Sequence, residues 1–344
     1  MTKNMNSLAI VVLANDEECV IQDSVISVLQ AVTPRDKLFV IADNCTDDTA
    51  KVAENAGAHV VIRNNGKANG KGHALAWFAK KFASELLDYA MVVILDADSV
   101  IKSDFIEVIK SQLPDKNRAF QCLVYPVYNN NSPIARLAAL SELIDQLIFD
   151  RIRTTLNCPV RFRGTGMVIP PNTLVELSSL LDTHVEDIAL SLLLTAGGDR
   201  IVQIDRAVVY DPKPDTSYAA SQQRARWFRG QWRALWEYRE IITKIILKGP
   251  PSWSLLSSLF LRPKWLVLML SFLLAFLFSP WPWLSLIFWT YALGGVILLL
   301  LGMLLIPDSR IFLPAIFHIP VYLWMWLQSI ILSLQSSTWR RTRK

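Results

Sequence analysis

The sequence predicts an α/β domain with a mostly parallel, Rossmann-like β-sheet, followed by an α-helical membrane region. Short β-rich runs alternate with helical patterns, and the order strand, helix, strand requires a parallel sheet covered on both faces. Residues up to about 250 mix polar and apolar types, whereas the remainder is overwhelmingly apolar. The length of 344 residues fits about two domains, and ~250 residues suffice for one sizeable core.

The strands and helices of the soluble part are predicted from apolar runs and from helix-capping residues. The first strand is expected over residues 8–14, which are all apolar. Further strands are expected over residues 38–42, 60–62 and 91–95. The first helix is expected to open at Asn15, whose side chain would cap it with Glu18 as its capping-box partner. Further helices are expected from residues 46–49 onward, over 72–87 and over 186–195.

Three carboxylates, Asp43, Asp96 and Asp98, come directly after expected strands. In parallel sheets, ligands gather beyond the carboxyl ends of the strands. Residues two apart in an extended segment point to the same side, so Asp96 and Asp98 can meet on one hard cation such as Mg²⁺ or Mn²⁺. The same spacing also occurs in ordinary turns, so both interpretations of this pair stay open at this point.

A second acidic pair, Glu186-Asp187, opens the helix expected over residues 186–195. A carboxylate at a helix start is a common structural device, and Asp187 alone favours that interpretation. The segment Gly164-Thr165-Gly166 favours a general base at Asp187, because a flexible loop lets a substrate approach the backbone closely.

Gln223, Arg226 and Trp227 have the spacing i, i+3, i+4, which places them on one face of a helix. Arg offers a planar fork for a diphosphate and Trp a flat apolar surface for a sugar ring. The alternative is an interfacial helix whose Arg and Trp mark the headgroup level, and both descriptions can hold together. Residues 218–248 contain seven Lys and Arg against two Glu, which suits anionic lipid or a diphosphate better than nucleic acid.

Residues 64–72 contain three glycines and two lysines, including Lys71. Such a loop can present amide groups and positive charge to a phosphate, although its spacing is not that of a P-loop. A plain surface loop is the alternative. The four cysteines lie far apart in sequence, which indicates neither zinc nor a disulfide framework and favours reduced thiols in a cytosolic domain.

The C-terminal third contains three apolar stretches. Residues 265–279 are short of the ~20 needed to span a bilayer, whereas 284–306 and 311–334 are long enough. The C-terminal basic residues Arg340, Arg341, Arg343 and Lys344 should stay cytoplasmic. Two full crossings are therefore expected, with 265–279 re-entrant or interfacial, and three crossings are the alternative. No signal peptide or earlier membrane helix is expected at the N-terminus.

Taken in order, these segments resemble glycosyltransferase family 2, over about residues 7–245. The similarity is strongest to its membrane-bound inverting branch, which contains cellulose, chitin and hyaluronan synthases and ceramide glucosyltransferase. The segments that carry it are Asn15 to Glu18, Asp43 to Thr49, Lys71-Gly72, Asp96 to Asp98, Gly164 to Gly166, Glu186-Asp187 and Gln223 to Trp227. Val185 departs from the pattern, since many members have Thr before Glu-Asp.

The resemblance implies a GT-A fold, an inverting single displacement, a UDP-sugar donor and a divalent cation. It further implies that Asp43 contacts uracil, Lys71 the nucleotide and Asp96 the donor. Asp98, with Asp96, would bind metal, and Asp187 would be the base. The acceptor and diphosphate would meet Gly164, Thr165, Gly166, Glu186, Gln223, Arg226 and Trp227.

We therefore expect a cytoplasmic catalytic domain over residues 1–217, amphipathic interfacial helices over 218–263 and a membrane region over 264–344. The expected protein is a multi-pass enzyme of the plasma (inner) membrane that glycosylates a lipid or a growing β-linked glycan, as a homo-oligomer if it makes polymer. A sugar nucleotidyltransferase and a non-catalytic scaffold that binds nucleotide-sugar are the alternatives.

Overall fold

The computed structural model describes residues 6–65, 70–113, 118–181, 183–214, 216–261, 264–306 and 309–335. The chain forms two compact units. Unit 1 comprises residues 1–125, 157–212 and 234–255, and unit 2 comprises residues 126–156, 213–233 and 256–344.

An eight-stranded mixed sheet organises unit 1, in the order β3-β2-β1-β4-β7-β6-β8-β5. Its first four strands are parallel: β3 (His59–Arg63), β2 (Lys37–Asp43), β1 (Leu8–Ala14) and β4 (Met91–Asp96). Antiparallel pairs join β4 to β7, β7 to β6 and β8 to β5. These strands are β7 (Met167–Ile169), β6 (Ala119–Val127), β8 (Ile201–Pro212) and β5 (Val100–Ile101). The expected parallel sheet is confirmed for its first half.

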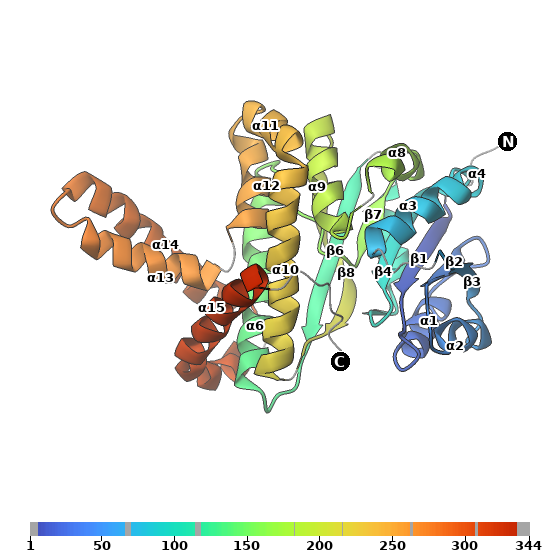
Figure 1. The fold of residues 1–344 in the computed structure, drawn as a ribbon, viewed down its shortest axis with the longest axis horizontal. Helices are drawn as coiled ribbons and strands as arrows, with labels where there is room; N and C mark the ends of the chain where they lie inside the picture. Colours follow the sequence, from blue (N-terminus) through green and yellow to red (C-terminus); the bar gives the residue numbers. More distant parts are fainter. Residues whose placement is uncertain are drawn as a thin grey trace. The chain divides into compact units, whose positions relative to one another are not determined.

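Alternation along the strands separates two apolar cores. One face of the sheet packs against α1 (Ile21–Leu29), α2 (Thr49–Asn55) and α5 (Phe105–Ser111). The other packs against α3 (Lys71–Lys81), α4 (Ala83–Leu86), α8 (Pro171–Leu177) and α9 (Glu186–Gly197). Figure 1 shows α3 on one face of β1 and β4, with α1 and α2 on the other. Both faces being covered explains why these strands read as continuous apolar runs.

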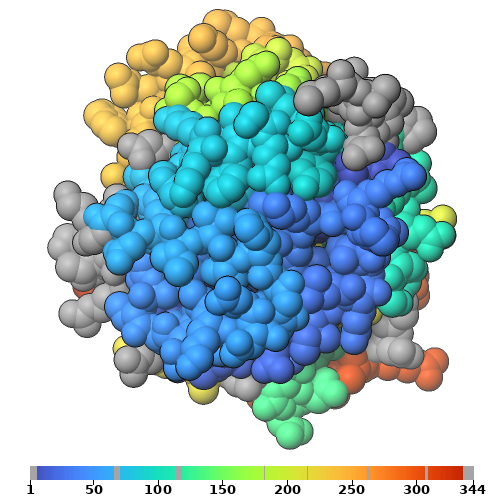
Figure 2. Space-filling view, turned by 90° about the vertical axis from the view of Figure 1, so that its right-hand side faces the viewer, coloured from blue at the N-terminus to red at the C-terminus, as the bar shows by residue number. Residues whose placement is uncertain are grey.

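Figure 2 shows one face of the molecule, on which the segments coloured from blue to cyan, the N-terminal part of unit 1, pack closely against one another. A short helical turn, Ser178–Leu180, follows α8, and α11 (Arg239–Leu247) packs against α9.

The first helix begins later than expected. α1 starts at Ile21, and the Asn15 side chain donates instead to the Asp43 carbonyl oxygen at 2.7 Å. The backbone turn before α1 is closed by the Glu17 carbonyl, which accepts from the amides of Val20 and Ile21. The expected cap at Asn15 was therefore wrong, because that side chain joins the loops after β1 and β2.

Unit 2 is helical. Its helices are α6 (Pro133–Ile144), a π-helical turn (Asp145–Asp150), α7 (Arg151–Thr155), α10 (Ser217–Glu237, of which residues 217–233 belong here), α12 (Pro250–Phe260, from residue 256), α13 (Lys264–Leu277), α14 (Pro282–Leu305), a 3₁₀ segment (Ser309–His318) and α15 (Ile319–Gln335). Pro314 lies inside the 3₁₀ segment.

Two helical stretches in the described part of unit 2, Pro282–Leu305 and Ser309–Gln335, are long and apolar enough to cross a membrane. The count becomes three if the bent pair of α12 and α13 is one crossing. Both counts proposed from sequence therefore remain open. The basic residues Arg340, Arg341, Arg343 and Lys344 lie outside the described residues.

Candidate active site

Asp96 is the last residue of β4, and its carboxylate meets Lys71 at the start of α3. Lys71 Nζ lies 2.5 Å from Asp96 Oδ1, with side chains that are 43% and 21% exposed. Asp98 follows in the turn after β4 and is half-buried. Asp96 thus stands at the carboxyl edge of the sheet as the sequence predicted, whereas Asp98 lies in a turn and not in the extended segment on which the expected pairing of the two carboxylates was based.

The loop 164–166 lies beside Asp96. Thr165 Oγ1 accepts from the Asp96 amide at 3.2 Å and shares a 2.8 Å hydrogen bond with Ser99 Oγ. Buried Gln121 donates to the Thr165 carbonyl at 2.9 Å. Gly164 has a φ of +88°, which favours glycine, and a Cβ there would lie 4.0 Å from Asp96 Oδ2, so the loop passes beside this carboxylate.

The N-terminus of α3 packs directly on the segment that leads into α9. A Cβ at Gly72 would lie 2.3 Å from the Thr183 carbonyl oxygen. A Cβ at Gly70 would lie 2.7 Å from His184 Nδ1, and the rings of His73 and His184 are edge to face with centroids 5.4 Å apart. Only a residue without a side chain at position 72 permits this approach, which brings Lys71 toward Glu186.

Glu186 and Asp187 open α9 as expected. Burial, and then the neighbouring Asp187 carboxylate, raise the pKa of Glu186, against the positive charge of Lys71. Burial also raises the pKa of Asp187, while its hydrogen bond from the Ile188 amide and the charge of Arg161 lower it. Asp96 and Lys71 act electrostatically on both carboxyls. The four groups therefore belong to one site.

Asp43 ends β2 and is buried, with 6% of its surface exposed. It forms an ion pair with Arg63 at the end of β3 and accepts from Asn44 Nδ2 at 2.8 Å. Burial raises the pKa of the Asp43 carboxyl, and the Arg63 contact counteracts that shift. Arg63 is a member of this region that the sequence analysis missed, because a charged residue ending a short strand gives no local signal.

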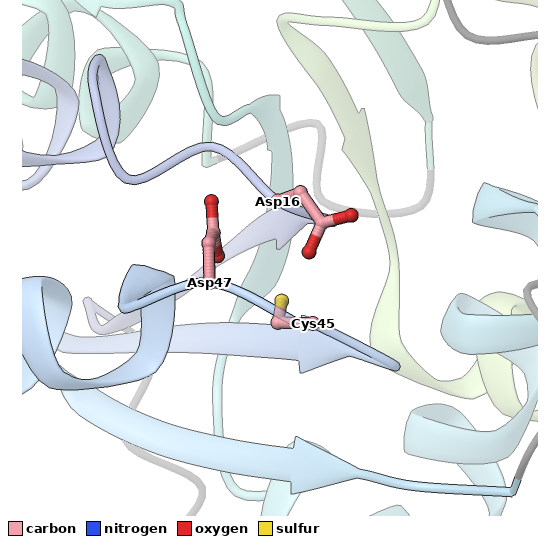
Figure 3. Close-up of side chains that lie close together, drawn as sticks. All are labelled: Asp16, Cys45 and Asp47. Atoms are coloured by element: carbon pink, nitrogen blue, oxygen red, sulfur yellow. The ribbon is translucent and has the colours of Figure 1, made fainter.

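A further group, Asp16, Cys45 and Asp47, joins the loops after β1 and β2, with one ligand atom of each within 4.8 Å of the others. Figure 3 shows the three side chains converging from these loops. Asp16 accepts from the Thr46 amide at 2.6 Å and Asp47 from the Thr49 amide at 3.0 Å. Burial raises the pKa of the Cys45 thiol, which disfavours the thiolate that binds metal. These contacts account for the group as a connection between loops.

Gln223, Arg226 and Trp227 lie on α10 in unit 2, all half-buried, with the helical spacing that the sequence predicted. Gln223 and Trp227 line a depression together with Glu142 and Lys213, whose charged atoms are 2.7 Å apart. The carboxylates described above belong to unit 1. That the α10 residues and these carboxylates serve one active site stays a prediction.

The family of this protein is shown by a family model that matches most of the chain. Residues 6–230 match the family model described as "Glycosyltransferase like family 2". The chain belongs to this family. It is accordingly an enzyme of the glycosyltransferase type, with a GT-A fold whose mostly parallel half carries the acidic edge.

One solved glycosyltransferase structure shares the fold, and two further structures align with lower scores. The mannosyltransferase PcManGT from Pyrobaculum calidifontis, in complex with GDP-Man and Mn²⁺, aligns with a TM-score of 0.51 and 16% identity over 95% of this chain and 85% of its own. S. aureus TarS 1–349 with UDP-GlcNAc aligns at 0.49 and 13%, over 95% and 89%. Glucosyl-3-phosphoglycerate synthase from Mycobacterium tuberculosis, with Mg²⁺ and UDP, aligns at 0.42 and 22%, over 61% and 73%. No curated protein matches the chain.

The residues of this glycosyltransferase fit a hard divalent cation beside β4. Asp96 and Asp98 would supply carboxylate oxygens, which are the ligands that Mg²⁺ and Mn²⁺ prefer. Asp96 Oδ1 is paired with Lys71, and Gly164 lies beside Oδ2. Gln121 holds the loop 164–166, and the charge of Arg161 acts on Asp187. Neither residue was predicted from the sequence, because neither lies in a motif.

Proposed function

We propose that this enzyme transfers a sugar from a UDP-sugar to a membrane-held acceptor, either a lipid or a growing β-linked glycan, with inversion and with a divalent cation. The main support is the convergence on Asp96: the Lys71 ammonium pairs with its carboxylate, Thr165 of the loop 164–166 accepts from its backbone amide, and the acidic pair Glu186-Asp187 interacts with its charge. An ammonium group beside carboxylates at the carboxyl edge of a parallel sheet suits a phosphorylated ligand.

The donor is proposed to bind along this edge. Asp43 would contact uracil, Lys71 the phosphates, and Asp96 the donor. Asp98, with Asp96, would hold Mg²⁺ or Mn²⁺, which would neutralise the negative charge on the departing diphosphate. Lys71 supplies positive charge to the same group, and its position is fixed by the packing of α3 on residue 183.

Asp187 is proposed as the general base. It would take the proton of the acceptor hydroxyl while that oxygen forms a bond to the anomeric carbon, and UDP would leave from the opposite face. A base with a raised pKa holds the proton more strongly, which favours proton transfer near neutral pH. Ser191 fixes the start of α9, because its hydroxyl donates to the Asp187 carbonyl at 2.6 Å and accepts from the Phe162 amide at 2.8 Å.

The acceptor is proposed to meet Gly164 to Gly166, Glu186 and the α10 residues Gln223, Arg226 and Trp227. The two apolar helical stretches in unit 2 support attachment to a bilayer. We propose the plasma (inner) membrane with the catalytic unit on the cytoplasmic side, where UDP-sugars occur. A polymeric product would favour a homo-oligomer.

The test is turnover by full-length protein reconstituted in lipid and supplied with a panel of labelled UDP-sugars. Sugar transfer should occur with one donor, and Asp187→Asn should reduce its rate 10²-fold or more, the range for loss of a general base, while UDP binding persists. Asp199→Asn is the matched control, because Asp199 follows the same helix and is exposed. UDP binding without turnover in wild type would indicate a scaffold. Formation of a nucleotide-sugar from UTP and a sugar phosphate would indicate a nucleotidyltransferase.

The product distinguishes the two acceptor classes. A labelled product that extracts into organic solvent would indicate a glycolipid, whereas a high-mass product that a glycosidase degrades would indicate polymer synthesis. Either product supports sugar transfer, and the absence of both with every UDP-sugar would contradict it.

A further inference from the structure

Two tyrosines of unit 1 form an aromatic pair that the proposed reaction does not use. Tyr125 lies on β6 and is 37% exposed, and Tyr210 lies on the neighbouring strand β8 and is half-buried. Figure 1 shows these two strands side by side. The ring centroids are 6.0 Å apart and the ring planes are inclined by 72°, so the rings meet edge to face. Such a pair uses the face of one ring only, which leaves flat aromatic surface for a ligand.

Both tyrosines lie on the face of the sheet that carries α9 and its proposed base. Phe120 and Cys122 of β6 pack in the core on the opposite face. Because side chains alternate along a strand, Tyr125 faces away from that core. Val209 of β8 packs in the same opposite core, so Tyr210 faces away from it as well. The face that the two tyrosines share is therefore the one covered by α3, α8 and α9.

The strand register places Tyr125 beyond the carboxyl edge of the parallel strands. Met167 of β7 pairs with Ile94 of β4 on one side and with Gln121 of β6 on the other. β4 and β6 run in the same direction, because both are antiparallel to β7. Asp96 lies two residues past the level of Met167, and Tyr125 lies four residues past it. With ~3.3 Å per residue and ~4.8 Å between strands, the Cα atoms of Asp96 and Tyr125 are about 12 Å apart.

Tyr210 lies beside the segment that leads away from Asp98. It pairs with Val100 of β5, which follows Asp98 by two residues. Between these two, Ser99 shares a 2.8 Å hydrogen bond with Thr165 of the loop that is proposed to meet the acceptor. The aromatic pair is thus continuous with the proposed acceptor loop and with the proposed cation ligand.

We propose that Tyr125 and Tyr210 bind a sugar ring of the acceptor other than the ring that receives the transferred sugar, so that the acceptor is a carbohydrate chain. This inference rests on the proposed function and selects among its acceptors. Groups in contact lie within ~4.5 Å of each other, so a Cα separation of about 12 Å from Asp96 suits a ring further along the acceptor better than the transferred sugar.

The chemistry of the pair suits a sugar better than an acyl chain. A pyranose ring has apolar C–H faces and a rim of hydroxyl groups. The tyrosine side chain has an electron-rich apolar face and a phenolic hydroxyl that donates and accepts hydrogen bonds. An acyl chain would contact the rings but would offer no partner to the hydroxyls.

The experiment begins with the product that full-length wild-type protein in lipid makes from the UDP-sugar it uses. That product should contain at least two sugars in one chain, whether or not a lipid carries the chain. Partial digestion with a glycosidase then supplies chains of different lengths, and calorimetry measures their Kd for the enzyme in the presence of UDP and Mg²⁺. Chains of three or more sugars should bind about three- to tenfold more tightly than a single sugar, the range for one aromatic contact.

Leucine variants test the two rings. Tyr125→Leu and Tyr210→Leu should each weaken binding of the longer chains about three- to tenfold, with unchanged Kd for UDP and for a single sugar. Tyr125→Phe keeps the ring and should restore binding of the longer chains to within about twofold of wild type. Tyr89→Leu is the matched control, because this half-buried tyrosine precedes β4 at the opposite, amino edge of the sheet.

The outcomes separate this inference from the proposed function. A product with one sugar on a lipid would overturn the inference and leave sugar transfer established. Wild-type affinity that does not depend on chain length would also overturn it, and so would unchanged affinity for the longer chains in both leucine variants. Equal weakening for a single sugar and for longer chains, with a lower melting temperature, would assign the pair a structural role only. If Tyr210→Leu does not fold, the more exposed Tyr125 decides. No transfer by wild type with any UDP-sugar would contradict the proposed function itself.

Discussion

The contact between Gly72 and the Thr183 carbonyl gives the sharpest test of the site geometry, through the variant Gly72→Ala. The added Cβ would lie 2.3 Å from the Thr183 oxygen and 2.8 Å from the Leu181 oxygen. Both obstacles are backbone atoms, so α3 must separate from residues 181 and 183. Overpacking of a close-packed interior costs ~1–3 kcal/mol, which corresponds to a melting temperature lower by about 2–12 °C in a unit of this size.

The same separation should lower activity, because Lys71 precedes Gly72 and Glu186 follows the displaced segment. A displacement of about 1 Å at reacting groups can reduce a rate ~10²-fold. The assay is thermal unfolding in detergent together with sugar transfer. Gly197→Ala is the control, since its Cβ would meet only Asp199 Oδ2 at an ordinary 3.8 Å. The described packing would be refuted if Gly72→Ala melted within 1 °C of that control and kept its activity.

Three further outcomes are expected. The kcat/KM should fall as pH decreases through the raised pKa of Asp187, because only the ionised carboxylate accepts a proton; a profile that is flat from pH 5 to 8 would contradict this role. EDTA should remove sugar transfer and added Mn²⁺ or Mg²⁺ should restore it, whereas full activity after exhaustive chelation would exclude the cation. The substitution Arg63→Met should raise the pKa of Asp43 further. Above the ordinary pKa of aspartate, the folded variant then binds more protons than the unfolded variant, so its stability falls as pH rises. The melting temperature of the variant should therefore decrease from pH 5 to pH 8 more steeply than that of wild type.

The parallel half of the fold could be predicted from sequence because each buried strand is a continuous apolar run. Residues 8–14 form β1 as expected, and Asp43 and Asp96 end β2 and β4. Asn15 was misread for a definite reason: an Asn after a strand satisfies a helix amide or a neighbouring loop carbonyl equally well. The choice was made by Asp43, which is 28 residues away.

The candidate site was predictable in its members but not in its contacts. Asp96, Asp187 and Lys71 each lie in a recognisable segment, whereas the role of Gly72 depends on a backbone carbonyl 111 residues later in the chain. Arg63, Gln121 and Arg161 act through partners brought near by the fold, so no local pattern distinguishes them from ordinary polar residues. The proposed roles of Gln223, Arg226 and Trp227 still rest on sequence.

The position of α3 links the donor side of the site to the base. Burial makes the ionised forms of Glu186 and Asp187 unfavourable, and Lys71 opposes that effect on both. The same ammonium pairs with Asp96 and is proposed to meet the phosphates of the donor. A change that moves α3 away from residue 183 would therefore weaken donor binding and raise the pKa of the base together. Loss of activity in Gly72→Ala should accordingly be accompanied by a shift of the acid limb of the pH profile to higher pH, which a defect in donor binding alone would not produce.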